Sequence, residues 1–135
     1  MPDAIAQFAD AKYLNLETFR KTGLGVRTPV WFAQDPQIAP GNTAGLAARF
    51  YVYSLPDVGK VKRIRNNPKV RIAPCTMRGE LRGAWVEARA RICPPEESVN
   101  GQALLRRKYG LLKIVGELYG KIIGRKNVTI AIELD

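Results

Sequence analysis

Apolar and polar residues alternate along much of the chain with the period of two that is typical of β-strands. The pattern predicts six strands, over residues 13–20, 26–33, 49–54, 69–76, 85–92 and 128–134. The clearest is 85–92, whose inward face would consist of Val86, Ala88, Ala90 and Ile92. The two small alanines on this face predict a closely filled interior rather than a wide cavity.

Helical spacing of apolar residues accounts for much of the remaining chain. It predicts helices over residues 2–12, 57–66, 96–109 and 111–123. Pro29 lies inside the second predicted strand, and because proline has no N–H it requires an edge strand, a bulge or a break. Segment 34–48 carries two prolines and two glycines without a clear period. A loop of this length is either a binding loop that orders over a ligand or a loose hairpin tip.

Six strands with three or four helices indicate an α+β fold, mainly β, whose sheet closes into a small barrel. The 135 residues are expected to form a single domain, 1–135. No apolar run approaches the roughly 20 residues that a membrane helix needs, so no membrane partner is expected. The N-terminal residues do not resemble a secretory signal, and the two cysteines lack metal or redox spacing. We therefore expect a cytoplasmic protein with reduced thiols.

The composition restricts the chemistry further. The chain has no histidine, which excludes catalytic triads with a histidine base and zinc sites with histidine ligands, and no metal site is expected. The net charge is +10, and residues 60–91 hold ten Lys or Arg against two Glu. The partner is therefore expected to be anionic, either nucleic acid or a phosphorylated cofactor.

Segment 57–66 has the features of an anion site. Apolar residues recur on one side of this predicted helix, and four cations occupy its other sides: Lys60, Lys62, Arg63 and Arg65. A phosphate near Gly59 would meet unpaired N–H groups, the positive end of the helix dipole and at least two cations. The alternative is a solvated basic face on an amphipathic helix, and the pattern alone leaves both interpretations open.

Three motifs follow one another over residues 28–75. They are Thr28-Pro-Val-Trp-Phe32, Gly59-Lys-Val-Lys-Arg-Ile-Arg65 and Asn67-Pro-Lys-Val-Arg-Ile-Ala-Pro-Cys75. In this combination the chain resembles the FMN-binding split-barrel family of pyridoxamine phosphate oxidase, and within it the branch of deazaflavin-dependent oxidoreductases. The resemblance covers roughly residues 12–134 and implies a six-stranded split β-barrel with short flanking helices. It also implies a homodimer with its cofactors, FMN or the deazaflavin coenzyme F-420, at the subunit interface.

The resemblance implies cofactor-binding residues in four segments. Arg27 would match an arginine at the start of the second strand, and the cofactor ring would be lined by Thr28, Pro29 and Val30. The ribityl chain would face Tyr53 and Ser54, and the phosphate would be surrounded by Gly59, Lys60 and Arg63. The pocket would be closed by Pro74 and Cys75. The chain departs from the family at Val58, where a serine hydroxyl often contacts the phosphate. The resemblance assigns no catalytic residue.

The leading hypothesis is an oxidoreductase that transfers hydride between FMN or F-420 and a small organic substrate. The many basic residues favour the deazaflavin, because its tail adds a phosphodiester and carboxylates. One alternative is a basic nucleic-acid-binding module, with Trp85, Arg89 and Arg91 as its strand-binding face, although no known nucleic-acid motif is present. Another is a flavin-binding protein without catalysis.

Outward aromatic residues add an expectation about assembly. Trp31, Tyr51 and Tyr53 fall on the outward faces of their strands and would form an exposed apolar patch on a monomer. We therefore expect a homodimer whose interface includes the strand bearing Trp31 and the helix from residue 57.

Overall fold

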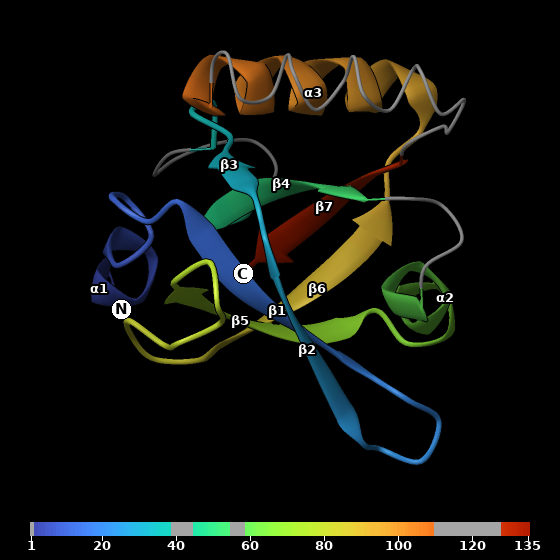
Figure 1. Cartoon of the computed structure of the whole chain (residues 1–135). Coiled ribbons are helices and arrows are strands. Elements are labelled where there is room, and N and C mark those ends of the chain that lie inside the picture. The colour runs from blue at the N-terminus through green and yellow to red at the C-terminus, as the bar shows by residue number, and fades with distance from the viewer. Residues whose placement is uncertain (1, 39–44, 55–58, 110–127) are drawn as a thin grey trace.

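The computed structural model describes residues 2–38, 45–54, 59–109 and 128–135, and within them one antiparallel sheet of seven strands is flanked by three helices (Figure 1). The strands are β1 Tyr13–Phe19, β2 Gly25–Val30, β3 Phe32–Gln34, β4 Ala48–Ser54, β5 Lys69–Cys75, β6 Val86–Ile92 and β7 Val128–Leu134. The helices are α1 Pro2–Ala6, α2 Gly59–Asn66 and α3 Pro95–Tyr109. The helix predicted over 111–123 and much of the loop predicted over 34–48 lie outside the described residues.

The strand order is β2-β1-β5-β6-β7-β4-β3, so β2 and β3 are the two opposite edges of the sheet. Only Trp31 separates these edge strands along the chain, which requires the sheet to curl until its edges approach each other. They are the two halves of the strand predicted over 26–33. Pro29 lies on the edge strand β2 just before this break, as its missing N–H predicts. The predicted split-barrel fold is confirmed.

Inward-facing residues fill the barrel as the alternation predicts. Val70 and Ile72 are buried on β5, and Ala90 is buried on β6. Phe50 is fully buried on β4, and its ring centroid lies 5.1 Å from that of Phe8 and 5.6 Å from that of Phe32. These edge-to-face and tilted contacts close one end of the interior.

The N-terminal helix is shorter than predicted. Helix α1 ends at Ala6, and the backbone then continues in turns in which the Phe8 N–H donates to the Ile5 carbonyl. Phe8 is 1% exposed because these turns direct its ring into the barrel. Burying this aromatic ring outweighs the continuation of a short helix that has little stability of its own.

Helix α3 covers the outer surface of β3, β4 and β7 (Figure 1). Tyr51 is only 1% exposed beneath it, and Gly101 permits the close approach, because a Cβ there would lie 2.9 Å from the Tyr51 ring. Trp31 stacks on Tyr109 of α3, with ring centroids 4.8 Å apart. The expectation that Tyr51 is exposed is therefore wrong, and Trp31 is partly covered, because a helix distant in sequence packs over them.

Two features of the described residues bear on membrane and metal binding. None of the helices within these ranges is long and apolar enough to cross a membrane. The same ranges contain no group of three or more His, Cys, Asp or Glu side chains arranged to hold a metal ion.

Candidate anion-binding site

Helix α2 presents its cations at one end of the barrel because its apolar face is fixed against the core. Val61 is fully buried and Ile64 is 3% exposed, and both belong to the main core cluster. This packing sets the rotation of the helix next to β1 and β6. Lys60 and Arg63 are both left half-buried at the margin of the core.

The guanidinium of Arg63 is held in a defined position. Its Nε donates a 2.6 Å hydrogen bond to Oγ1 of Thr18, which is 1% exposed on β1. A Cβ at Gly59 would lie 2.6 Å from Nη1 of Arg63, so the side chain folds back over the first residue of the helix. Gly59 therefore leaves room for the guanidinium, and Thr18 orients it.

The electrostatics around α2 favour an anion. Burial and the nearby Arg63 lower the pKa of Lys60, and burial and the nearby Arg20 lower the pKa of Arg63. Both shifts show that each cation is destabilised by lost hydration and by another positive charge. An anion placed among Arg20, Lys60 and Arg63 would relieve both effects.

The ion pairs of the sheet contrast with this cluster. Five arginines on the outer faces of the strands pair with acids, and they are Arg27, Arg49, Arg71, Arg89 and Arg91. Within the described ranges, no ion pair involves Arg20, Lys60 or Arg63. Helix α2 and the β1–β2 turn therefore hold a group of cations that the ion pairs of the sheet do not neutralise.

Three further residues predicted for the cofactor lie on β2 and β4. Thr18 pairs with Val26, two residues before Thr28, so Thr28 lies on the β2 face beside the Thr18–Arg63 contact. Phe32 on β3 pairs with Val52 on β4. Val30 ends β2 two residues before Phe32, and Ser54 ends β4 two residues after Val52. Val30 and Ser54 are buried, but Val30 pairs with Leu14, four residues along β1 from Thr18.

Tyr53 has a different environment from its neighbour. It is half-buried on the opposite face of β4 from Ser54, opposite Thr129 in the register. Of the predicted residues, Gly59, Lys60 and Arg63 therefore lie together at α2, and Thr28 lies on the neighbouring strand face. Ser54 ends β4 five residues before Gly59, and Val30 lies opposite Leu14, which also pairs with Pro74.

Other predicted residues lie elsewhere. Pro74 and Cys75 end β5 opposite Leu14 and Tyr13, about 13 Å along β1 from Thr18. Cys75 lines a cavity of about 440 Å³ at that end, and burial raises the pKa of its thiol. The structure therefore does not bring this pair together with the α2 cations.

Arg27 and Pro29 point to the outer face of β2, away from Thr28 and Val30. Arg27 Nε donates a 2.9 Å hydrogen bond to Glu17, which also binds Arg71. The guanidinium carbons of Arg27 and Arg71 lie 4.8 Å and 5.0 Å from the ring centroid of Trp85. Sequence reasoning missed this cluster, because three strands and a loop contribute to it.

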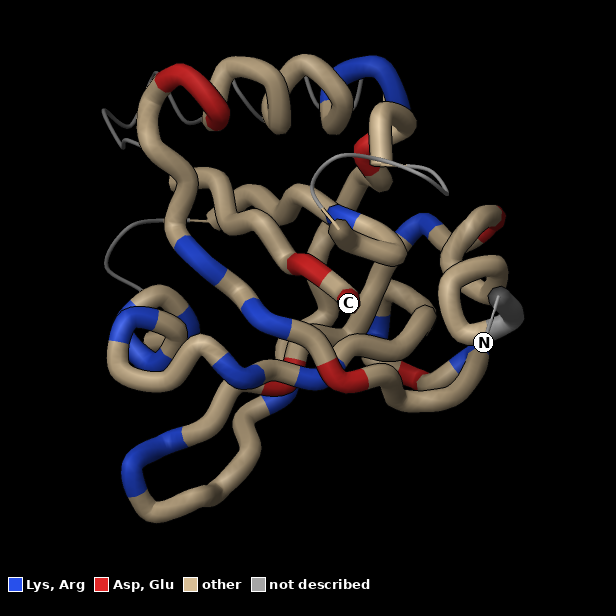
Figure 2. Tube along the Cα trace, turned by 180° about the vertical axis from the view of Figure 1, so that it is seen from behind, with Lys and Arg blue, Asp and Glu red and all other residues tan. Residues whose placement is uncertain are grey.

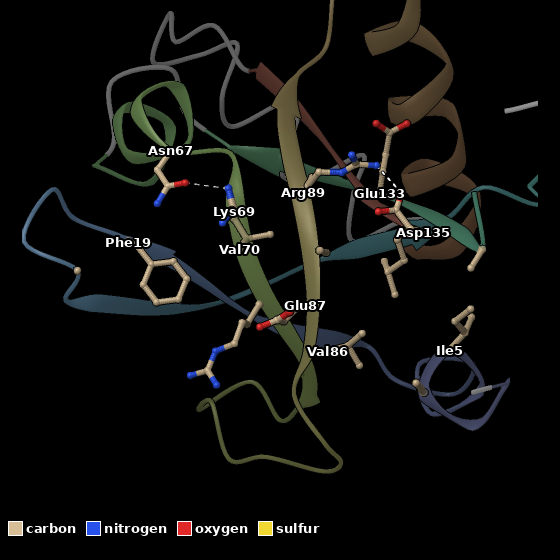
Figure 3. Close-up of a pocket in the computed structure, with 16 residues that line it drawn as sticks. Ile5, Phe19, Asn67, Lys69, Val70, Val86, Glu87, Arg89, Glu133 and Asp135 are labelled. Carbon is tan, nitrogen blue, oxygen red and sulfur yellow. Dashed lines mark hydrogen bonds and ion pairs between the residues drawn. The ribbon is translucent and has the colours of Figure 1, made fainter. Parts of the chain in front are cut away.

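A hollow of about 680 Å³ lies along β5, β6 and β7 (Figure 3). None of the residues predicted for the cofactor lines it. Its charges largely cancel, because Arg89 pairs with Asp135, and Glu87 and Glu133 also line it. We place the anion site at α2 rather than here, since charge selects an anionic ligand and volume does not.

Comparison with known proteins gives similarity in structure only. No family model matches the sequence, and no curated protein matches it. A candidate pyridoxamine 5′-phosphate oxidase from Listeria innocua has 13% identity and a TM-score of 0.60, with 97% of this chain and 90% of that one covered. This chain and the Listeria protein share the split-barrel fold. HutZ, the haem storage protein from Vibrio cholerae, has 14% identity and a TM-score of 0.67, covering 99% and 89%. An F-420 reductase has 16% identity and a TM-score of 0.54, covering 95% and 90%.

Proposed function

We propose that the chain is an oxidoreductase that binds FMN or coenzyme F-420 and transfers hydride between it and a small organic substrate. The observation that carries this proposal is the cluster of Arg20, Lys60 and Arg63, three cations beside one another at the end of a split barrel. The sequence motifs and the names of two structural neighbours, an oxidase candidate and an F-420 reductase, support the same class.

The residues of this chain would divide the work of binding. Lys60 and Arg63 hold the phosphate, and Thr18 keeps Arg63 aimed at it. Thr28 and Val30 lie along the ring, and Ser54 lies near the chain that joins ring and phosphate. The bound cofactor supplies the hydride chemistry, and the protein supplies its position and electrostatic surroundings.

Haem is disfavoured although one neighbour stores it. The chain has no histidine, the usual protein ligand of haem iron.

The nucleic-acid alternative is also weakened. Arg91 is bound by Glu97 and Glu133, Arg89 pairs with Asp135, and Trp85 is covered by two arginines. The face that could have bound a single strand is therefore engaged within the chain.

Cofactor titration tests the proposal. We expect the purified protein to bind FMN or F-420 at least tenfold more tightly than riboflavin, because two charge-assisted contacts to the phosphate are absent with riboflavin. Flavin fluorescence measures the affinities. A protein that binds none of the three and retains nucleic acid would contradict the proposal. Reduction or oxidation of the bound ring by added substrates then separates an enzyme from a binding protein.

We also propose that the chain acts as a homodimer with the cofactor between the subunits. The aromatic residues that first suggested an interface are largely covered by α3, so this proposal rests on the family resemblance. Analytical ultracentrifugation at micromolar concentration should give a dimer with and without cofactor. A monomer under both conditions would rule the arrangement out.

A further inference from the structure

Arg20 lies beside the phosphate site and was not among the residues predicted from the sequence. It follows β1 directly, and its backbone is fixed by two bonds across the β1–β2 turn. The Arg20 N–H donates to the Leu24 carbonyl over 2.9 Å, and the Gly23 N–H donates to the Arg20 carbonyl over 2.8 Å. Gly23 makes this tight turn possible with a φ of 90°.

The alternation of β1 places Arg20 on the same face as Thr18, the residue that binds Arg63. The positive charge of Arg20 reaches Arg63 strongly enough to lower its pKa further, after the effect of burial. Figure 2 shows the cations of α2 and those of the β1–β2 turn on the same flank of the molecule. The two segments therefore form one positively charged surface.

This surface offers more donors than one phosphate needs. Arg63 Nε is bound to Thr18, and within the described ranges no hydrogen bond is made by its Nη groups. These groups and Lys60 suffice for one phosphate. Arg20 is exposed and has no ion-pair partner among residues 2–38, 45–54, 59–109 and 128–135. It can therefore receive a second anionic group next to the first.

We propose that Arg20 is a specificity-determining residue that binds a second anionic group, so that the site prefers an isoalloxazine-type cofactor extended beyond its first phosphate by further negative charge. This inference rests on the proposed function and deepens it. Two known classes of cofactor have the required chemistry. The deazaflavin F-420 carries carboxylates beyond its phosphodiester, and FAD carries a second phosphate.

Titration of Arg20→Gln with riboflavin, FMN, FAD and F-420 tests the inference. We expect the affinity for the extended cofactor to fall about tenfold, the loss of one charge-assisted contact, and that for FMN to fall less than about threefold. Arg65→Gln is the matched control, because it removes the same charge from an exposed position in the last turn of α2. Its affinities should stay within about twofold of the parent.

The outcomes separate the possible ligands. A loss confined to F-420 identifies the deazaflavin tail as the second anion, and a loss confined to FAD identifies its second phosphate. Equal losses for FMN and the extended cofactors, or no loss for any of them, would overturn the assignment of Arg20.

A second measurement does not depend on any flavin. If the parent binds none of the four cofactors, the proposed function fails, and thermal unfolding with inorganic phosphate and pyrophosphate decides the inference alone. Pyrophosphate should then raise the melting temperature of the parent more than phosphate does, and Arg20→Gln should lose that extra increase. Equal effects of the two anions on the parent would refute a second anionic subsite.

Discussion

Replacing Lys60 or Arg63 by alanine is expected to weaken binding of FMN or F-420 by about one to two orders of magnitude. Charge-assisted hydrogen bonds of this kind contribute roughly 1.5–3 kcal/mol each. Arg63 should show the larger loss, because Thr18 has already fixed its guanidinium and little rotamer entropy is lost on binding. Fluorescence titration of both variants measures the change.

Riboflavin and an unrelated cation provide the controls. Riboflavin lacks the phosphate, so its affinity should hardly respond to either substitution. Arg65→Ala removes a cation from the same helix at an exposed position and should leave FMN binding nearly unchanged. If the Lys60 and Arg63 variants bind FMN as tightly as the parent, the phosphate binds elsewhere.

Glu17→Gln is expected to reduce the free energy of unfolding at pH 7 by about 2 kcal/mol, because it removes a buried carboxylate that binds two arginines. Glu17 is 4% exposed, and Arg27 and Arg71 approach its two oxygens from the neighbouring strands β2 and β5. The substitution leaves both guanidinium groups with a weaker acceptor. Urea unfolding of parent and variant measures the difference.

The same carboxylate predicts a dependence on pH. Burial opposes its ionisation, but hydrogen bonds and charge from Arg27 and Arg71 outweigh burial and lower the pKa of Glu17 below 4.5. The ionised group therefore stabilises the fold fully above about pH 4.5, its ordinary value, and this contribution disappears as the pH falls through the lowered pKa. The difference between parent and variant should shrink on acidification.

Glu87→Gln is the matched control for this prediction. Glu87 lies opposite Arg71 in the β5–β6 register, but it is exposed, and no ion pair involves it within the described ranges. Its substitution should change the free energy of unfolding by less than about 0.5 kcal/mol. An equal effect of the two substitutions would show that Glu17 has no special role.

Much of the barrel could be predicted because the relevant signals are local. The six runs of alternating residues correspond to the observed strands, one of which divides at Trp31, and the edge position of Pro29 follows from its missing donor. The cationic face of α2 was also visible, since Val61 and Ile64 mark the buried side of that helix.

The errors arose where distant segments meet. Tyr51 was expected to be exposed because it alternates with inward residues, yet α3 packs over it and its hydroxyl donates to Glu97. The resemblance predicted that Pro74 and Cys75 close the pocket, and β5 places them opposite Leu14 and Tyr13, away from the α2 cations, so their role stays a prediction. Period and motif specify a face of a strand, but they do not specify its neighbours.

The sequence by itself determined the strands, their inward faces and the basic helix, because side-chain alternation and helix-ending residues act over a few neighbours along the chain. Only the tertiary structure decided that Thr18 binds Arg63, which lies 45 residues away, and that Arg20 adds its charge to the same place. Strand pairing and the packing of α2 on the core bring these groups together. The positions of the anion-binding cations therefore depend on the closed barrel rather than on any one segment.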